Sequence, residues 1–174
     1  MFLLVMTVLC GVVYTGVMTG AAQLFFRRQA NGGIIAVTLK DGAVREYGSA
    51  LIAQEFTQPR YLIGRPMMIS NLSPVSAEQA ALVQQRIDWW RQFDLGNASD
   101  IPADLVMAPG SAADPDISPA AAEYQAARIA KARDISVDDV RAIINKYTTG
   151  RFLGFIGEPA VNVLKVNLAL DGLI

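Results

Sequence analysis

The opening stretch, "MFLLVMTVLCGVVYTGVMTGAAQLFFRR" (residues 1–28), decides how the rest of the chain is interpreted, because no charged side chain occurs before Arg27. As a helix, residues 1–26 would span ~39 Å, which exceeds the ~30 Å hydrocarbon core of a bilayer. A cleaved signal peptide would have a basic start and a shorter apolar centre. We therefore predict a retained transmembrane anchor over residues 1–28, with a cleaved signal peptide as the alternative.

Two features of this stretch bear on its partners and its orientation. Gly16 and Gly20 form a G-x-x-x-G pair, which leaves a groove where another transmembrane helix can approach closely. Such pairs also arise by chance in membrane helices, but we favour packing against the helices of another protein. Arg27 and Arg28 follow the apolar run, so the positive-inside rule alone would place the following domain in the cytoplasm.

The composition of residues 29–174 predicts one small soluble domain and excludes several classes of function. A net charge of −1 provides no basic surface for nucleic acid. The chain has no histidine, which excludes histidine-based catalysis and imidazole metal ligands, and its single cysteine, Cys10, lies in the apolar run. We expect no metal site and no catalysis by this chain alone, although a serine–lysine nucleophile or a carboxylate pair stays open.

The first half of the predicted domain combines short strands with one helix. Apolar and β-branched residues flank Asp41-Gly42, which predicts a hairpin, and a further short strand is expected over residues 50–56. Ser76 is a predicted N-cap for a helix over residues 77–94. We expect Trp89 and Trp90 of this helix to pack in the core, with a partner surface as the alternative.

Two further helices are predicted from their caps. Ser118 and Pro119 open the first, on which Tyr124, Arg128 and Lys131 share one stripe. We interpret that stripe as a solvated charged face, with contact to a phosphate or an acidic partner as the alternative. Ser136 opens the second helix, which is expected to run to Gly150.

The last segment, residues 163–170, fits two periods. Its apolar residues alternate as in a strand, but some of them also recur at helical spacing. We favour a strand. The expected fold class is α+β, with one N-terminal transmembrane helix followed by a single soluble domain (residues 29–174) of short strands and about three helices.

Four segments in this order resemble the C subunit family of the Kdp potassium-transporting P-type ATPase, KdpC, and together they cover most of the chain. They are "AAQLFFRRQANGG", "GSALIAQEFTQPRYLIGRP", "DLVMAPGSAADPDISPAAAEYQAARIAKAR" and "GEPAVNVLKVNLALD". The resemblance implies a non-catalytic subunit of a high-affinity potassium uptake pump. Its partners would be a channel-like A subunit, a B subunit that hydrolyses ATP, a small membrane peptide subunit and the lipid bilayer.

The family is described as a catalytic chaperone, which raises the ATP affinity of the B subunit and stabilises the complex. The resemblance implies a single-pass protein of the bacterial or archaeal cell (inner) membrane, with its soluble domain on the outer face, against the weak indication of the two arginines. No cofactor is expected to bind tightly. ATP would act through the B subunit, so an effect on ATP affinity would be allosteric.

The loop after Gly64-Arg65-Pro66 is shorter than in the family and lacks its glycine pair, and we interpret residues 70–72 as a remnant of it. The best candidates for nucleotide or partner contacts are then Gln125, Arg128 and Arg133. Two other functions stay open: a free-standing membrane-anchored binding module, and an anchored enzyme that uses serine and lysine or carboxylates.

Overall fold

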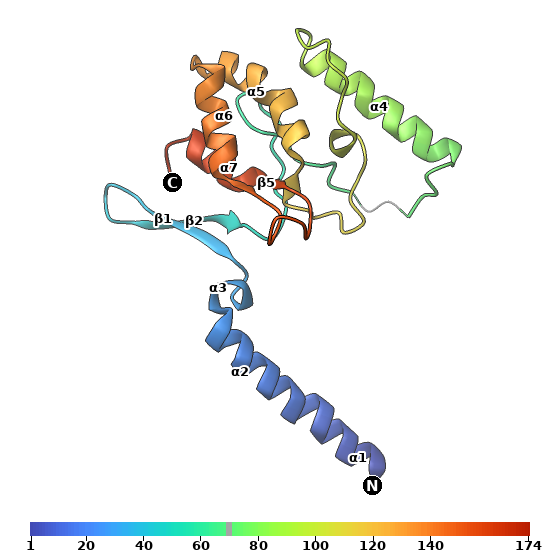
Figure 1. The fold of residues 1–174 in the computed structure, drawn as a ribbon. Helices are drawn as coiled ribbons and strands as arrows, with labels where there is room; N and C mark the ends of the chain where they lie inside the picture. The colour runs from blue at the N-terminus through green and yellow to red at the C-terminus, as the bar shows by residue number, and fades with distance from the viewer. Residues whose placement is uncertain (69–70) are drawn as a thin grey trace. The chain divides into compact units, whose positions relative to one another are not determined.

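The structure, a computed structural model, describes residues 1–68 and 71–174 (Figure 1). The remnant loop expected at residues 70–72 therefore lies partly outside the described residues, because Ser70 is not among them. The chain forms two compact units, Met1–Leu51 and Ile52–Ile174. The predicted domain boundary at residue 28 stays a prediction.

The first unit begins with a long apolar helix, built from α1 (Phe2–Thr7), a π-helical segment η1 (Val8–Tyr14) and α2 (Thr15–Phe25). Residues Phe2–Phe25 have a mean hydropathy of 2.1 and are long and apolar enough to cross a membrane. A short helix, α3 (Arg27–Ala30), follows.

A two-stranded antiparallel hairpin completes this unit, with β1 at Ile34–Thr38 and β2 at Val44–Ser49. The predicted turn is confirmed: Gly42 has a φ of +82°, which glycine adopts readily, and the Asp41 carboxylate accepts from the Ala43 N–H at 2.9 Å. The further strand expected over residues 50–56 is wrong. That segment is irregular, and the Ala53 N–H bonds to the Ala113 carbonyl instead of to a strand.

The second unit begins its regular structure with α4 (Ala77–Phe93), at the predicted place. The Ser76 hydroxyl accepts from the Gln79 N–H at 3.2 Å, which satisfies a donor of the first turn. Trp90 is buried and donates from Nε1 to the Leu105 carbonyl at 3.1 Å, whereas Trp89 is exposed and stacks on Phe93. The expectation that both tryptophans pack in the core is therefore wrong for Trp89.

Two helices with the predicted serine caps follow a short 3₁₀ turn, η2 (Ala103–Leu105). They are α5 (Pro119–Arg133) and α6 (Val137–Lys146). Ser118 and Ser136 each accept a backbone N–H three residues later. The second helix ends before the predicted Gly150, because the chain turns at Tyr147 into a strand.

That strand belongs to a small antiparallel sheet in the order β3-β5-β4. Strand β5 (Ala160–Asn162) lies between β3 (Asp116–Ile117) and β4 (Thr148–Thr149). The sheet therefore joins segments that are far apart in the sequence, and its central strand comes from the end of the chain.

The strand expected at the C-terminal end is wrong, since Val163–Leu170 is a helix, α7. The Asn162 side chain caps it by accepting from the Lys165 N–H at 3.2 Å. Most of its residues are buried, so apolar side chains occur at nearly every position and their alternation carries no information on the period. The fold class, α+β behind one long apolar helix, is confirmed.

One hydrophobic core fills the second unit and joins α4, α5, α6, α7 and β5. Its fully buried larger side chains include Leu62, Trp90, Leu105, Ile129, Val140, Val161 and Val166. Leu62 comes from an irregular segment, residues 59–63, which has no strand partner. How this segment is held determines the geometry of the candidate site.

Candidate functional site

Two side-chain amides hold segment 59–63 as a neighbouring strand would. The Leu62 N–H donates to Asn167 Oδ1 at 2.7 Å, and Asn167 Nδ2 donates back to the Leu62 carbonyl at 2.9 Å. Gln125 does the same for Ile63, with both bonds at 2.9 Å. Buried backbone groups need partners, and here α5 and α7 provide them from side chains.

Arg128 binds the same segment from the next turn of α5. Its guanidinium donates to the carbonyls of Pro59 and Tyr61, and Nη2 donates to Gln125 Oε1 at 2.7 Å. Its Cζ lies 5.0 Å from the centroid of the Phe93 ring, a cation–π distance. Nε is buried and has no hydrogen-bond partner among the described residues.

Burial lowers the pKa of Arg128 to about 10, because removal from water disfavours the charged form. The charges of Asp94 and Tyr124 act in the opposite direction and offset part of this effect. None of the ion pairs among the described residues involves Arg128. The site therefore contains a buried cation held by carbonyl oxygens and aromatic rings.

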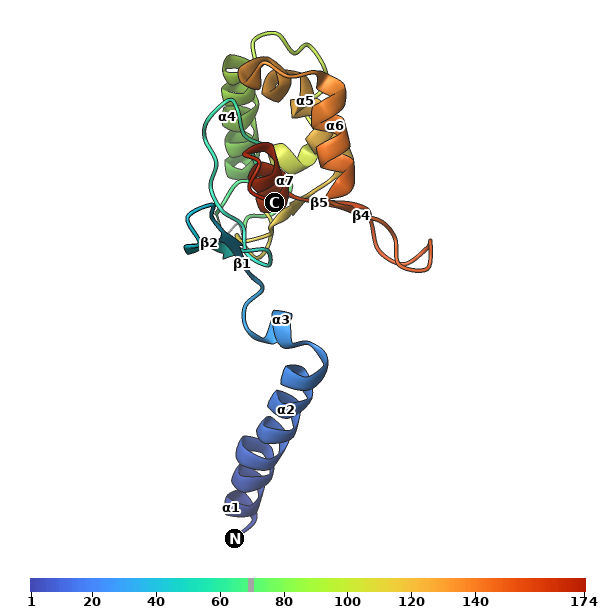
Figure 2. The same cartoon turned by 90° about the vertical axis from the view of Figure 1, so that its left-hand side faces the viewer.

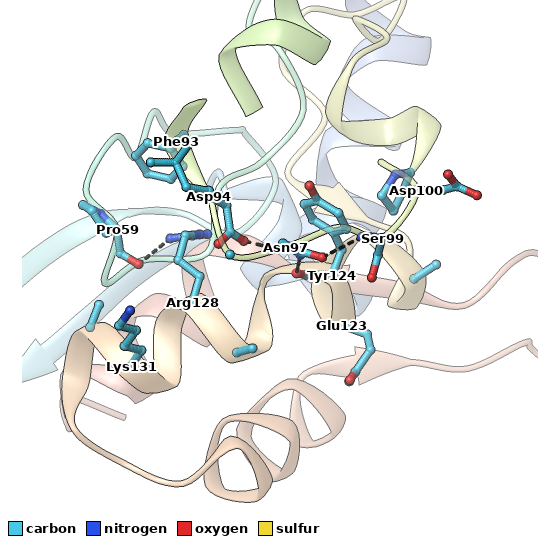
Figure 3. A pocket seen from close by; sticks show the side chains of 16 residues that line it. Pro59, Phe93, Asp94, Asn97, Ser99, Asp100, Glu123, Tyr124, Arg128 and Lys131 are labelled. Carbon is cyan, nitrogen blue, oxygen red and sulfur yellow. Dashed lines mark hydrogen bonds between the residues drawn. The ribbon is translucent and has the colours of Figure 1, made fainter. Parts of the chain in front are cut away.

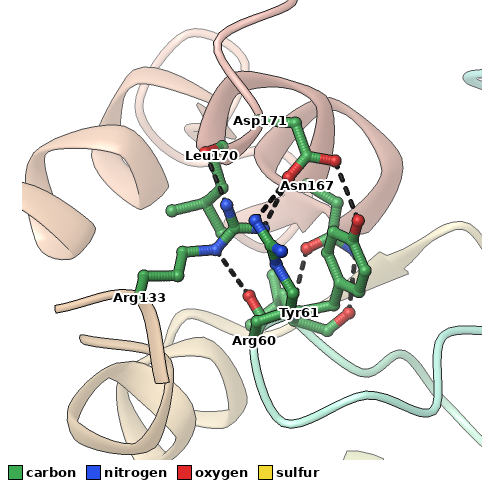
Figure 4. Close-up of polar contacts among 7 residues, drawn as sticks. Arg60, Tyr61, Arg133, Asn167, Leu170 and Asp171 are labelled. Atoms are coloured by element: carbon green, nitrogen blue, oxygen red, sulfur yellow. Dashed lines mark hydrogen bonds and ion pairs between the residues drawn. The ribbon is translucent and has the colours of Figure 1, made fainter. Parts of the chain in front are cut away.

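Arg133, at the end of α5, forms hydrogen bonds both to segment 59–63 and to the residues at the end of α7 (Figure 4). Its Nε donates to the Arg60 carbonyl at 2.7 Å, Nη1 to the Leu170 carbonyl at 2.6 Å and Nη2 to Asp171 Oδ1 at 2.8 Å. Asp171 also accepts from the Tyr61 hydroxyl at 2.9 Å. Burial, and then this bond to Asp171, raises the pKa of Tyr61.

A pocket of about 1020 Å³ lies beside Arg128, between the end of α4, residues 94–102 and one face of α5 (Figure 3). Phe93 and Tyr124 form apolar walls. Its charged side chains are Arg128, Lys131, Asp94, Asp100 and Glu123.

The pocket has the size and lining of a binding site. It contains acidic as well as basic groups, so it is not a simple anion site. Glu123 at its edge is already paired with Arg141, at 2.5 Å. No group of metal-ligating side chains is found among residues 1–68 and 71–174. A pocket of this size with a few polar groups is typical of a ligand or peptide site.

The structure brings the three predicted contact residues, Gln125, Arg128 and Arg133, together around segment 59–63. Most of their donors are already bonded to carbonyl oxygens of the chain. Their role as nucleotide or partner contacts stays a prediction. The interpretation of Tyr124 and Arg128 as part of a solvated face is wrong, because both are buried by the 59–63 and 94–102 segments, while Lys131 is exposed.

Gly16 and Gly20, the other predicted site residues, lie in α2. Among the described residues, a Cβ atom added at either position would meet nothing within 4 Å. Their predicted contact with a partner helix stays a prediction.

Sequence reasoning missed Asn167 and Tyr61. Asn167 is a polar residue in the apolar run "VNVLKVNLAL", and a buried asparagine in such a run nearly always has a hydrogen-bond partner. The apolar run alone could therefore have predicted that Asn167 is buried and hydrogen-bonded. Nothing in the sequence shows that its partner is Leu62, 105 positions away.

Comparison with known proteins gives one consistent result. The family model for KdpC, described as K+-transporting ATPase, c chain, matches residues 1–172. The potassium-transporting ATPase KdpC subunit of Listeria monocytogenes is 52% identical over 173 residues, which cover 98% of this chain and 91% of the relative.

Two further relatives carry the same description. The Clostridium perfringens subunit is 50% identical over 190 residues, covering 98% of this chain and 93% of the relative. The Methylococcus capsulatus subunit is 46% identical over 185 residues, covering 99% and 95%. The similarity extends over the apolar helix and the soluble unit alike, and the chain therefore belongs to the KdpC family, the c chain of the K+-transporting ATPase.

Proposed function

We propose that this chain is a non-catalytic accessory subunit of an ATP-driven potassium uptake pump. The observation that carries the proposal is the family match over residues 1–172, which includes the candidate membrane helix. Its partners would be a channel-like A subunit, an ATP-hydrolysing B subunit and a small membrane peptide subunit.

We infer that the helix Phe2–Phe25 anchors the chain as a single pass in the cell (inner) membrane, with the soluble unit on the outer face. The chain would assemble and stabilise the complex and act as a catalytic chaperone that raises the ATP affinity of the B subunit. From the outer face it would do so by favouring one conformation of the pump, because an allosteric effect needs a difference in affinity between two states.

The proposal assigns a role to three residues of α5, which are Gln125, Arg128 and Arg133. Their bonds to segment 59–63 support a role in shaping the surface that a partner contacts, and the pocket beside Arg128 is the place where a nucleotide or partner group would reach them. We expect ATP to act mainly through the B subunit, because few of their donors remain free.

A free-standing anchored binding module is the second candidate, and the pocket of about 1020 Å³ within one chain is the observation that favours it. A ligand that binds the folded chain without any partner would raise its melting temperature. Such a shift in the isolated full-length chain, with no pump subunit present, would support this alternative.

The test is co-purification in mild detergent from potassium-starved cells. We expect the native chain to bring down a P-type ATPase and a channel-like subunit. The double variant Gly16→Ile, Gly20→Ile should lose them, because the added side chains fill the groove without disturbing the chain's own contacts. Ala22→Ile is the control, since two positions along a helix place it on another face.

A second measurement addresses the chaperone role. Purified chain is added to the A and B subunits, and the ATP concentration for half-maximal hydrolysis is measured. We expect a lower value with the chain present. An unchanged ATP dependence would refute the chaperone role and leave the assembly role standing.

A further inference from the structure

The loop between β4 and β5 exposes a concentrated set of large apolar side chains. Phe152 is 69% exposed, Leu153 70%, Phe155 74% and Ile156 50%. Figure 2 shows this loop extending from β4 and β5, away from the helices of the second unit. Single exposed apolar residues are ordinary, but four within five positions at a projecting tip indicate a contact surface.

The tip has a defined shape. Phe152 and Ile156 exchange two backbone bonds, from the Phe152 N–H to the Ile156 carbonyl at 2.8 Å and back at 3.0 Å. Between them Leu153 has a φ of +52°, a conformation that costs a leucine energy, and Gly154 has a φ of +83°. The turn therefore gives the exposed apolar side chains a defined backbone, and none of the described residues buries them.

The charges of the loop limit what can cover it. Arg151 and Glu158 pair with each other at 2.8 Å at its base, and residues 152–157 carry no charge. Segments that lie in the membrane interface combine apolar side chains such as phenylalanine and leucine with free lysine or arginine residues, which attract the lipid headgroups. The only basic residue of this loop, Arg151, is already paired, so an uncharged apolar surface of a protein fits the tip better than a lipid surface does.

We propose that residues 152–156, here called the apolar knob, dock into an apolar depression on the extramembrane surface of another subunit of the pump. This inference rests on the proposed assembly into a pump. Five residues are too few for a stable interface of ~800 Å² per partner. The knob therefore acts as a hot spot, a small buried centre that dominates the energy of a larger interface.

The full-length chain, co-expressed with its pump subunits, tests this. In a Cys10→Ser background, Phe155→Cys is labelled with a cysteine-reactive photo-crosslinker or with a polarity-sensitive fluorophore. Val75→Cys is the matched control, because Val75 is an apolar residue that is 92% exposed and lies outside the knob. Retention of the pump subunits is compared for Phe155→Ser and Val75→Ser, neither of which disturbs a buried side chain.

We expect position 155, and not position 75, to cross-link to another pump subunit in the assembled complex. Phe155→Ser should weaken retention of that subunit about tenfold or more, as loss of a hot spot does. A label at position 155 that stays exposed to water in the complex would overturn the docking. So would equal shielding in vesicles that contain this chain alone, which would assign the knob to lipid. If the native chain retains no pump subunit, the proposed function itself fails, and the docking fails with it.

Discussion

Replacing Asn167 by alanine should unfold the second unit at a markedly lower temperature. Asn167 is 1% exposed, and its amide satisfies both the N–H and the carbonyl of Leu62, which is itself fully buried. Alanine removes both partners at once and leaves two backbone groups without hydrogen bonds inside the core.

The magnitude follows from those two groups. An unsatisfied buried donor or acceptor costs about 1–3 kcal/mol, so two of them cost about 3 kcal/mol when local relaxation recovers part of the loss. For a domain of this size each kcal/mol lowers the melting temperature by about 3 °C. We therefore expect Asn167→Ala to melt about 10 °C below the native chain.

The assay is thermal unfolding of the full-length chain in mild detergent, followed by tryptophan fluorescence, which should shift as the buried Trp90 becomes exposed to water. Asn145→Ala is the matched control, because Asn145 is exposed on α6 and the same substitution there should leave the melting temperature nearly unchanged. If the two variants differ by less than about 1 kcal/mol, the amide of Asn167 does not hold segment 59–63 and the reasoning is wrong.

Three further predictions concern charge and backbone conformation. Because burial and Asp171 raise the pKa of Tyr61, the folded chain holds this proton more tightly than the unfolded chain, and this stability is lost as the pH rises above about 10. Asp171→Asn should lower the pKa of Tyr61, as measured by the absorbance of the phenolate. Asp134 follows α5 with a φ of +56°, a conformation that favours glycine. Asp134→Gly should therefore raise the free energy of unfolding by up to about 1 kcal/mol, as measured in a denaturant titration. Glu123→Gln breaks an exposed pair with Arg141 and should leave the denaturant midpoint nearly unchanged in the same titration.

Much of the fold could be predicted from short stretches of sequence, because the residues that cap the helices and form the hairpin turn are typical of those positions. The serine caps of α4, α5 and α6 and the Asp41-Gly42 turn are where the sequence places them. Prediction failed at α7, where burial on nearly all sides removes the polar face that marks a helix. The helix cap there is Asn162, which ends the preceding strand and gives no separate signal.

The candidate site could be predicted only in part, because its contacts span the chain. The polar residues of α5 could be selected, yet nothing local shows that Arg128 is covered by a segment before α4 and by the aromatic rings of α4 itself. Charged residues on a helix are usually exposed to solvent, and this general tendency led to the wrong interpretation of Arg128 as part of a solvated face. The knob was likewise not recognised, since four apolar residues near a glycine are also compatible with a buried strand.

The position of β5 and α7 at the end of the chain has a consequence for the order in which the protein is made. The central strand of the sheet, the amide that holds Leu62 and the carbonyl bound by Arg133 all come from residues 160–171. Folding of the second unit therefore cannot finish until residues 160–171 have been synthesised, because the contacts that close its core are long-range. The long apolar helix and the hairpin of the first unit are made well before them. A nascent chain interrupted before residue 160 has no closed core and is open to proteolysis.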